Sequence, residues 1–321
     1  MSENLVQQTE EVIEDNTKPL EKECVLKTTN LTKHYGRKNV VDGVNITINK
    51  GDIYGFIGKN GAGKTTVMKM VSTILNPASG EIELFGSKNL VEGCKKVGTI
   101  IETPVFYPYM NARQNIEVQC ILKGVKEKAV VDELLEVVGL KNAGRKKVKN
   151  FSLGMKQRLA IALALVGDPK FLILDEPMNG LDPEGIKEIR ELILKLNKEA
   201  GVTVFISSHI LGELHKMVTK YGVINDGKLV AEFDADELSQ KVKPCVKLVV
   251  NDPEKAVSVI EGKFGKIDIK RDGNTISIYE NIDNLVELNS VLAEAEIIVS
   301  SFTKEQGDYE DYFLSLMKGE A

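Results

Sequence analysis

The sequence predicts an α/β fold with a mainly parallel sheet. Three short, predominantly apolar runs without charges, at Ile53–Ile57, Phe171–Leu174 and 202–207, have the length and composition of buried parallel strands. Stretches with helical apolar spacing lie between them, at 65–75 and 184–197. Such alternation of strands and helices is typical of a parallel α/β core. An antiparallel β subdomain, a helical subdomain and a small α+β domain of ferredoxin-like type are predicted to complete the chain.

Composition limits the possible functions. The 321 residues are 42% hydrophobic and 28% charged, enough to bury two cores. A net charge of −5 gives no electrostatic footprint for nucleic acid, so no nucleic-acid partner is expected. The longest uncharged apolar stretch, 159–167, is about half of what a bilayer crossing needs, and no signal peptide is seen. We therefore expect a cytoplasmic protein. The four cysteines are far apart and are predicted to be reduced thiols.

The chain is expected to begin with a disordered acidic tail at 1–22, which is rich in Glu and too poor in apolar residues to order itself. The first domain is predicted over 23–240. Alternating apolar residues between 24 and 48 indicate antiparallel strands with turns near Gly36 and Gly43.

The segment 58–65 fits the phosphate-binding pattern G-x-x-x-x-G-K-[ST], and it lies between a predicted strand and a predicted helix. Its glycines allow backbone N–H groups to turn toward phosphate oxygens, and the helix N-terminus adds the positive end of its dipole. Lys64 is expected to reach the β- and γ-phosphates, and the Thr65 hydroxyl to ligate Mg²⁺. The predicted nucleotide contacts in this loop are Gly58, Lys59, Asn60, Gly61, Ala62, Gly63, Lys64, Thr65 and Thr66.

Two features near this loop each allow two interpretations. Tyr35 lies in the antiparallel region, where its ring would either stack on an adenine or anchor the hairpin to the core. The segment 102–110 is aromatic and interrupted by prolines, so it is either a surface for a partner or a loop folded onto its own helices. It belongs to a weakly patterned region, and a helical subdomain is predicted at about 95–168, with one amphipathic helix at 129–138.

Three further positions carry polar groups suited to phosphate chemistry. Ser152 is placed to cap a helix, which either offers free N–H groups to an anion or is capped without a ligand. The strand Phe171–Leu174 ends in Asp175 and Glu176, placed to hold Mg²⁺ through water and to polarise a water aimed at the γ-phosphate. His209 follows the strand 202–207, at the sheet edge where ligands gather. An acidic pair or a loop histidine with a purely structural role is the alternative.

The remaining chain is predicted to form a β-hairpin at the sheet edge, turning at 225–227, and then an accessory domain at 244–321. Strands and helices in the order βαββαβ resemble a ferredoxin-like domain. A last helix at 308–318 carries Tyr312 and Phe313 and is expected to pack on a neighbouring domain.

Together these stretches resemble the ATP-binding subunit of an ABC transporter over 25–233. The phosphate loop, a Ser-x-Gly opening a helix, a strand ending Leu-Asp-Glu-Pro, a Gly-Leu-Asp turn and a Ser-Ser-His occur in the family's order. The resemblance implies ATP hydrolysis with Mg²⁺. It also implies a role for each matching residue: Tyr35 stacks on adenine, Asp175 is the Mg²⁺-associated carboxylate, Glu176 the general base, Asp182 a dimer contact and His209 the sensor of the γ-phosphate.

The resemblance further implies partners. Two such subunits pack head to tail, as a homodimer or with a closely related ATP-binding subunit, so that Ser152 and Gly154 contact the partner's ATP. Separate transmembrane permease subunits are expected, which would place the chain on the inner face of the cell membrane. The loop at 102–110 is then the expected docking surface.

Two departures from the family pattern are informative. The family's Leu-Ser-Gly-Gly-Gln is Phe-Ser-Leu-Gly-Met at 151–155, which keeps the Ser and the second Gly. Glu102 stands where most members have Gln; it keeps an oxygen ligand for Mg²⁺ but adds a negative charge. Glu at this point and the C-terminal extension are similar to the bacitracin-resistance and lantibiotic-immunity branch, which suggests export of a peptide antibiotic or another amphiphile.

Two other functions stay open at this stage. A soluble ABC ATPase acting on ribosomes or DNA is one, although the paired ATP-binding halves or the long coiled coil usual in such proteins are not seen. An ATP-dependent sensor or clamp with little hydrolysis is the other, because of Glu102 and the altered sequence at 151–155.

Overall fold

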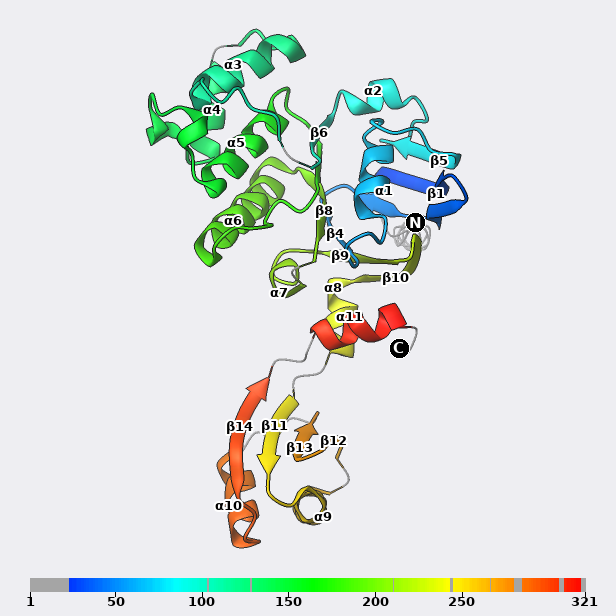
Figure 1. The fold of residues 1–321 in the computed structure, drawn as a ribbon, viewed down its shortest axis with the longest axis vertical. Helices are drawn as coiled ribbons and strands as arrows, with labels where there is room; N and C mark the ends of the chain where they lie inside the picture. The colour runs from blue at the N-terminus through cyan, green and yellow to red at the C-terminus, as the bar shows by residue number, and fades with distance from the viewer. Residues whose placement is uncertain are drawn as a thin grey trace, which may run out of the picture.

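The structure is a computed structural model that describes residues 23–102, 104–127, 129–209, 211–242, 245–265, 267–279, 285–305 and 309–318. The expected acidic tail at 1–22 lies outside these residues. A larger N-terminal domain and a smaller C-terminal domain follow one another along the long axis of the molecule, and the last helix lies between them (Figure 1).

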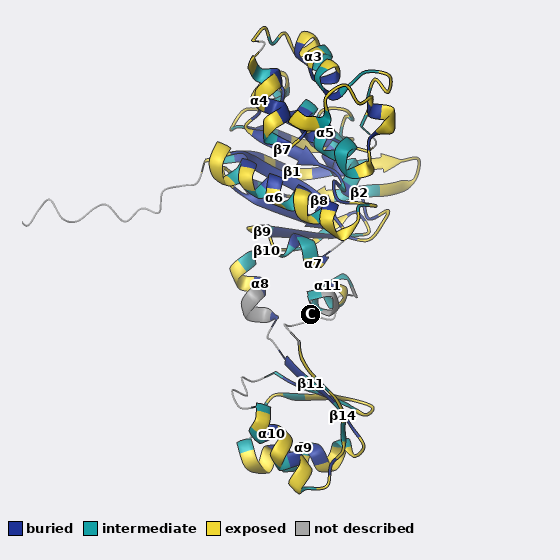
Figure 2. Cartoon of the chain, turned by 90° about the vertical axis from the view of Figure 1, so that its left-hand side faces the viewer, coloured by how far each residue is buried: buried dark blue, intermediate teal, exposed yellow. Residues whose placement is uncertain are grey.

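A mainly parallel sheet forms the centre of the N-terminal domain. Within the described residues it has the strand order β10-β9-β4-β8-β7-β6. The strands from β9 to β6 run parallel, and β10 closes the sheet as an antiparallel edge strand. Every residue of β4, β7 and β8 is buried, which confirms the prediction from their apolar runs (Figure 2). The bounds are β4 Ile53–Ile57, β6 Val97–Ile100, β7 Phe171–Leu174, β8 Thr203–Ser208, β9 Lys220–Asn225 and β10 Lys228–Asp234.

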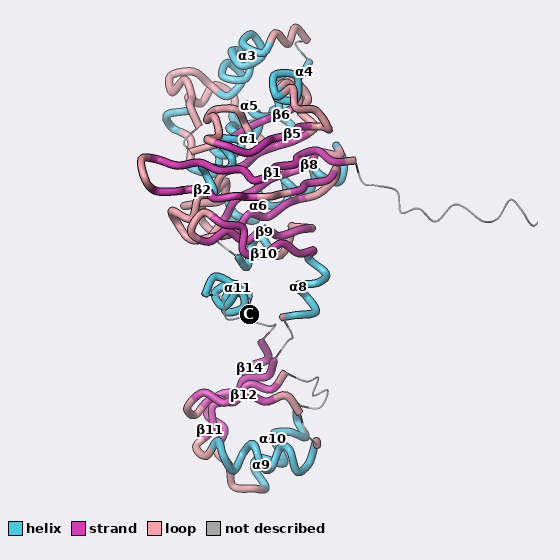
Figure 3. The backbone as a smooth tube through the Cα atoms, turned by 90° about the vertical axis from the view of Figure 1, so that its right-hand side faces the viewer, coloured by secondary structure: helices cyan, strands magenta, loops and turns pink. Residues whose placement is uncertain are grey.

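The antiparallel strands form a second layer beside this sheet (Figure 3). Strand β1 pairs with three neighbours, β2, β3 and β5. Helix α1 is packed between the layers, because Val67 and Met68 share one core with Phe56 of the large sheet and Leu26 of β1. The bounds are β1 Cys24–Tyr35, β2 Lys38–Val44, β3 Thr47–Asn49, α1 Lys64–Val71, β5 Ser79–Leu84 and α2 Leu90–Cys94.

The helical subdomain contains α3 (Ala112–Lys123), α4 (Ala129–Val137) and α5 (Leu153–Leu165). The expected range of about 95–168 also contains β6, which pairs with β7 and is part of the large sheet. Helix α3 begins with a capping box formed by Asn111 and Gln114. This helix start was not identified from the sequence, because the region has a weak apolar pattern. Helix α6 (Pro183–Ala200) follows the strand β7 and covers the sheet (Figure 2).

The C-terminal domain has the expected element order and its own core. Its described strands pair antiparallel in the order β12-β13-β11-β14, with α9 and α10 packed on them. After α8 (Ala235–Lys241) the elements are β11 Cys245–Val250, α9 Pro253–Phe264, β12 Ile269–Asp272, β13 Thr275–Ile278, α10 Leu285–Glu294 and β14 Val299–Glu305. Helix α11 (Tyr309–Lys318) then returns to the N-terminal domain, where it packs on β9, β10 and α7 (Leu211–Leu214), as predicted for the last helix.

Candidate functional site

The phosphate loop connects β4 to α1, and its backbone requires glycine at two points. Gly63 has φ +110°, and a Cβ there would lie 2.7 Å from the Val40 carbonyl oxygen. A Cβ on Gly58 would lie 2.4 Å from the Ile224 carbonyl oxygen. Both distances are too short for a side chain, so only glycine permits this path. The tip of the loop, Lys59 to Gly61, is exposed, while Ala62, Gly63 and Lys64 are buried.

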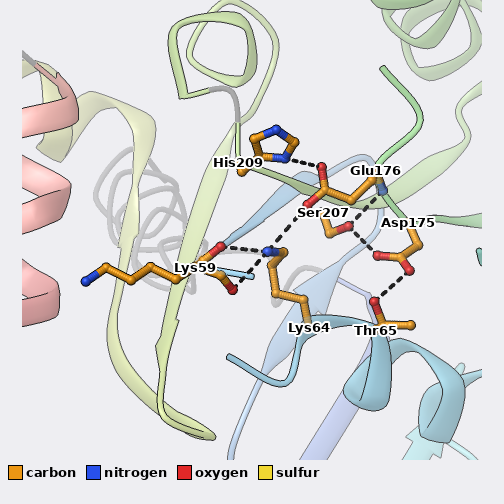
Figure 4. A network of polar contacts seen from close by, with 8 residues as sticks. Lys59, Lys64, Thr65, Asp175, Glu176, Ser207 and His209 are labelled. Atoms are coloured by element: carbon orange, nitrogen blue, oxygen red, sulfur yellow. Dashed lines mark hydrogen bonds and ion pairs between the residues drawn. The ribbon is translucent and has the colours of Figure 1, made fainter. Parts of the chain in front are cut away.

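The Lys64 ammonium lies inside the loop (Figure 4). Its Nζ donates to the carbonyl oxygens of Gly58, at 2.6 Å, and Lys59, at 3.3 Å, and lies 3.4 Å from Glu176 Oε1. The side chain is only 6% exposed, so these oxygens replace the water that a buried cation loses. Phosphate oxygens entering the loop would offer the same cation stronger, charged acceptors. The Lys59 side chain points away from this cluster.

Asp175 and Glu176 are tied together through Ser207. The Thr65 hydroxyl donates to Asp175 Oδ2 at 2.8 Å, and the Ser207 hydroxyl donates to Asp175 Oδ1 at 2.6 Å. Ser207 Oγ also accepts the Glu176 backbone N–H at 2.9 Å. The strands β7 and β8 lie side by side, so their carboxyl ends bring these groups to the mouth of the phosphate loop (Figure 4).

Glu176 is held in an unusual position. Its φ is +49°, in the left-handed region that residues other than glycine rarely adopt, and such strain is often found at functional sites. Oε2 lies 2.7 Å from His209 Nδ1, and Oε1 is buried with no hydrogen-bond partner in the described residues, facing Lys64 at 3.4 Å. The Lys64 ammonium is thus the partner of Oε1 in this structure, and His209 is the partner of Oε2.

The oxygen donors fit Mg²⁺. The ion prefers hard oxygen ligands and usually keeps waters, being bound by one or two carboxylates together with substrate phosphates. Thr65 and Asp175 supply one hydroxyl and one carboxylate at this point. Among the described residues, no group of three or more His, Cys, Asp or Glu side chains forms a metal cage. Mg²⁺ bound at Thr65 and Asp175 would therefore take its remaining ligands from water and the nucleotide.

Glu102 follows β6, with φ +60°. Its Oε1 lies 2.5 Å from Nζ of Lys69 on α1, and the side chain is 63% exposed. This ion pair neutralises the extra charge that Glu brings in place of Gln. The role of Glu102 as a Mg²⁺ ligand stays a prediction, and it requires the carboxylate to leave Lys69.

The other predicted residues lie at the edges of the domain. Tyr35 ends β1 with 54% of its surface exposed, so its ring is not part of the hairpin core, and adenine stacking stays a prediction. Ser152 caps α5 by accepting the Met155 N–H, and Asp182 caps α6 by accepting the Gly185 N–H. A Cβ on Gly154 would lie 3.9 Å from Cδ2 of Leu181, so the two capped helix starts are neighbours.

Two site residues were not assigned a role from the sequence. Ser207 connects the two carboxylates, and the Ser-Ser before His209 at the end of β8 was the available signal. Lys69, in the last turn of α1, forms an ion pair with Glu102, which follows the end of β6. No local pattern links residues that are so far apart in the chain.

The comparisons with known proteins agree with this geometry. The family described as ABC transporter matches residues 41–179. The Bacitracin transport ATP-binding protein BcrA of Bacillus licheniformis is 44% identical over 300 residues, covering 92% of this chain and 98% of the relative. The chain belongs to the family of ABC transporter ATP-binding proteins. This ABC ATPase subunit is also 45% identical to the Lantibiotic transport ATP-binding protein SrtF of Streptococcus pyogenes, over 66% of this chain and 92% of that protein.

Solved structures show the same fold for the ABC domain. An ATP-binding cassette in its ADP conformation superposes with a TM-score of 0.62 at 25% identity, covering 76% of this chain and 99% of the other. A dimeric cassette in a post-hydrolysis state with ADP and phosphate has a TM-score of 0.59 at 25% identity, over 65% of this chain and 98% of its own. The protein is thus an ATP-binding, ATP-hydrolysing subunit of an ABC transporter. None of the described helices is long and apolar enough to span a membrane.

Proposed function

We propose that this ABC ATPase subunit drives the export of a peptide antibiotic or a similar amphiphile through separate membrane-spanning subunits. The observation that carries the proposal is the extent of the likeness to the bacitracin transport protein, which covers 92% of this chain and therefore reaches into the C-terminal domain. A match confined to the ATP-binding domain would indicate only the ABC family, whereas a match over both domains also favours a related cargo. It favours a transporter over the ribosome- or DNA-acting alternative.

For hydrolysis, Lys64 would hold the β- and γ-phosphates, and Thr65 and Asp175 would hold Mg²⁺, which when bound would neutralise charge on the phosphate oxygens. Glu176 accepts the proton of the attacking water once phosphate oxygens take over the Lys64 ammonium that now faces its Oε1 at 3.4 Å, while His209 holds Oε2 at 2.7 Å. Lys64 already lies beside Glu176, which supports the placing of the γ-phosphate between the loop and this carboxylate. Glu102 would have to leave Lys69 before it could ligate Mg²⁺.

Two copies, or one copy and a closely related subunit, are proposed to pack head to tail. Ser152 and Gly154 would then contact the ATP of the partner, and Asp182 would lie at the contact. The adjacency of the two helix starts supports this, because α5 and α6 present both segments together on one side of the domain. The dimeric cassette of the same fold supports it as well.

The loop at 102–110 is proposed as the docking surface for the membrane subunit, which would place the chain on the inner face of the membrane. The loop is partly folded onto its own subdomain, because Val148 and Lys149 donate backbone N–H groups to Met110 and Pro108. Val105 and Tyr109 are nevertheless 89% and 72% exposed. Val105 also lines a groove of about 300 Å³ between β6, α3 and α5. An exposed apolar loop beside a groove is suited to a partner segment.

The proposal is tested by antibiotic susceptibility in cells that lack the chromosomal copy. The wild-type chain is expected to restore growth at inhibitory bacitracin or lantibiotic concentrations, and Glu176→Gln to restore none. Val105→Glu on the docking surface is expected to fail, while Val286→Glu, at a position 76% exposed on α10, is its matched control and is expected to succeed. Unchanged susceptibility to every peptide antibiotic, with ATP hydrolysis intact, would contradict the proposed cargo and leave the ATPase standing.

A further inference from the structure

Helix α11 belongs structurally to the ATPase domain although it follows the C-terminal domain in sequence. Phe313 is 1% exposed, and its ring lies 5.6 Å from that of Tyr221 and 6.0 Å from that of Phe233. Tyr309, Tyr312, Leu316 and Met317 pack against the same core. Among the described residues, the separate core of the C-terminal domain contains no residue of α11. The chain thus leaves the ATPase domain through α8 and returns to it through α11.

The first end of α11 contacts the segment that carries His209. The Tyr309 ring lies 3.8 Å from the His215 ring, and His215 Nδ1 lies 3.3 Å from the Tyr221 hydroxyl. His215 closes α7, whose first residue follows His209 by two positions. Leu214 of α7 is buried against β4, the strand that leads into the phosphate loop. Tyr309 therefore packs beside α7, the helix that follows His209 in the chain.

The second end of α11 contacts the hairpin that supports the phosphate loop. Asn225 Nδ2 donates to the Met317 carbonyl oxygen at 2.8 Å. In the same turn, Gly227 N donates to the Ala62 carbonyl oxygen at 3.0 Å, and the Gly227 carbonyl accepts the Asp42 N–H at 2.8 Å. The β9–β10 turn is thus bonded to the phosphate loop on one side and to α11 on the other.

We propose that α11, although it follows the C-terminal domain in sequence, positions both halves of the nucleotide site. Tyr309 acts through His215 and α7 on His209, and Met317 acts through Asn225 on the phosphate loop. The two contacts sit at opposite ends of one ten-residue helix, so a shift of that helix displaces both together. On the phosphate-loop side the link is a series of hydrogen bonds, and on the His209 side it is the packing of Tyr309 beside α7; measured coupling decides whether either affects catalysis. A misplacement of about 1 Å costs about a hundredfold in rate.

Loss of the contact at each end of α11 is expected to change a different kinetic parameter. This difference distinguishes a positioning role of α11 from a role in stability alone. In the purified full-length protein, Tyr309→Ala is expected to lower kcat for ATP about fivefold or more while KM stays within about twofold. Asn225→Ala is expected to raise KM about fivefold or more, because the phosphate loop loses support. The control is Leu314→Ala, at a position on the same helix that is 42% exposed; it leaves both parameters within about twofold.

The conservative variant Tyr309→Phe keeps the ring against His215 and is expected to restore kcat. Should Tyr309→Ala fail to fold, Tyr309→Leu retains apolar bulk without the aromatic face and answers the same question. Thermal midpoints are recorded for every variant. Variants that lower the midpoint while kcat and KM at 25 °C equal those of the wild type would overturn the proposal, since α11 would then only stabilise the domain. ATP hydrolysis by the isolated chain needs no transported cargo, so this outcome is independent of the proposed export.

Discussion

Replacing Glu176 by Gln tests the proposed general base with almost no change in shape. The amide has the same size, and its oxygen can still accept from His209 Nδ1, the contact that measures 2.7 Å in the wild type. What is lost is the negative charge beside Lys64, at 3.4 Å, and the basicity of the buried Oε1. The substitution therefore isolates the proton-accepting role from the packing role.

The expected loss is set by the contribution of a positioned base. Removing general base catalysis lowers turnover by about 10²–10⁴, which corresponds to about 2.7–5.4 kcal/mol in the activation free energy. The ion pair with Lys64 is partly buried, and its loss frees the ammonium for phosphate oxygens, so ATP affinity is expected to be retained or raised.

Turnover is measured from phosphate release at saturating Mg²⁺ and ATP, and affinity from binding of a fluorescent ATP analogue. His209→Gln serves as a comparison, because it removes the neighbour of Glu176 without removing the base. A Glu176→Gln enzyme whose turnover stays within about tenfold of the wild type would refute the assignment. A variant that no longer binds nucleotide would instead show that the carboxylate shapes the loop.

The remaining predictions concern the loop, the metal and pH. Gly63→Ala is expected to abolish ATP binding, because φ +110° and the contact of 2.7 Å with the Val40 oxygen exclude a Cβ; equilibrium binding checks this. Thr65→Val and Asp175→Asn are expected to raise the Mg²⁺ concentration for half-maximal hydrolysis about tenfold or more, since each removes an oxygen donor; a Mg²⁺ titration at fixed ATP measures it. Burial lowers the pKa of His215, helped by Lys216, so the folded state favours the neutral ring. Protonation of His215 therefore favours the unfolded state, so the free energy of unfolding falls as pH drops below the ordinary pKa of 6.5. The urea midpoint should drop less between about pH 7.5 and about pH 5.5 in His215→Gln than in the wild type.

The local parts of the fold were predictable from the sequence because local patterns specify them. The uncharged runs in β4 and β7 are buried on both faces, and the glycine spacing of the phosphate loop follows from backbone geometry at Gly63. The order of elements in the C-terminal domain was also predictable, because its strands and helices have different apolar periodicities and a turn at Gly273 separates two of the strands.

The long-range contacts were not predictable, and their physical reasons differ. Helix α3 has a weakly apolar face, so its capping box rather than its period marks its start. The apolar face of α11 indicated a neighbour but could not identify it, because Tyr221 and Phe233 are ordinary core residues of distant strands. The ion pair between Lys69 and Glu102 joins residues 33 positions apart, and Glu102 has a positive φ that no residue preference predicts.

We propose above that this ATPase works on a membrane partner that handles a peptide antibiotic. The most direct measurement is to tag the chain in its native cell, extract membranes in mild detergent, and assay the purified material with and without bacitracin. We expect co-purification of a polytopic membrane protein, ATP turnover that rises with the antibiotic, and loss of that protein in Val105→Glu but not in Val286→Glu. Recovery of ribosomal or DNA-repair proteins, with no polytopic membrane protein and no response to the antibiotic, would contradict it.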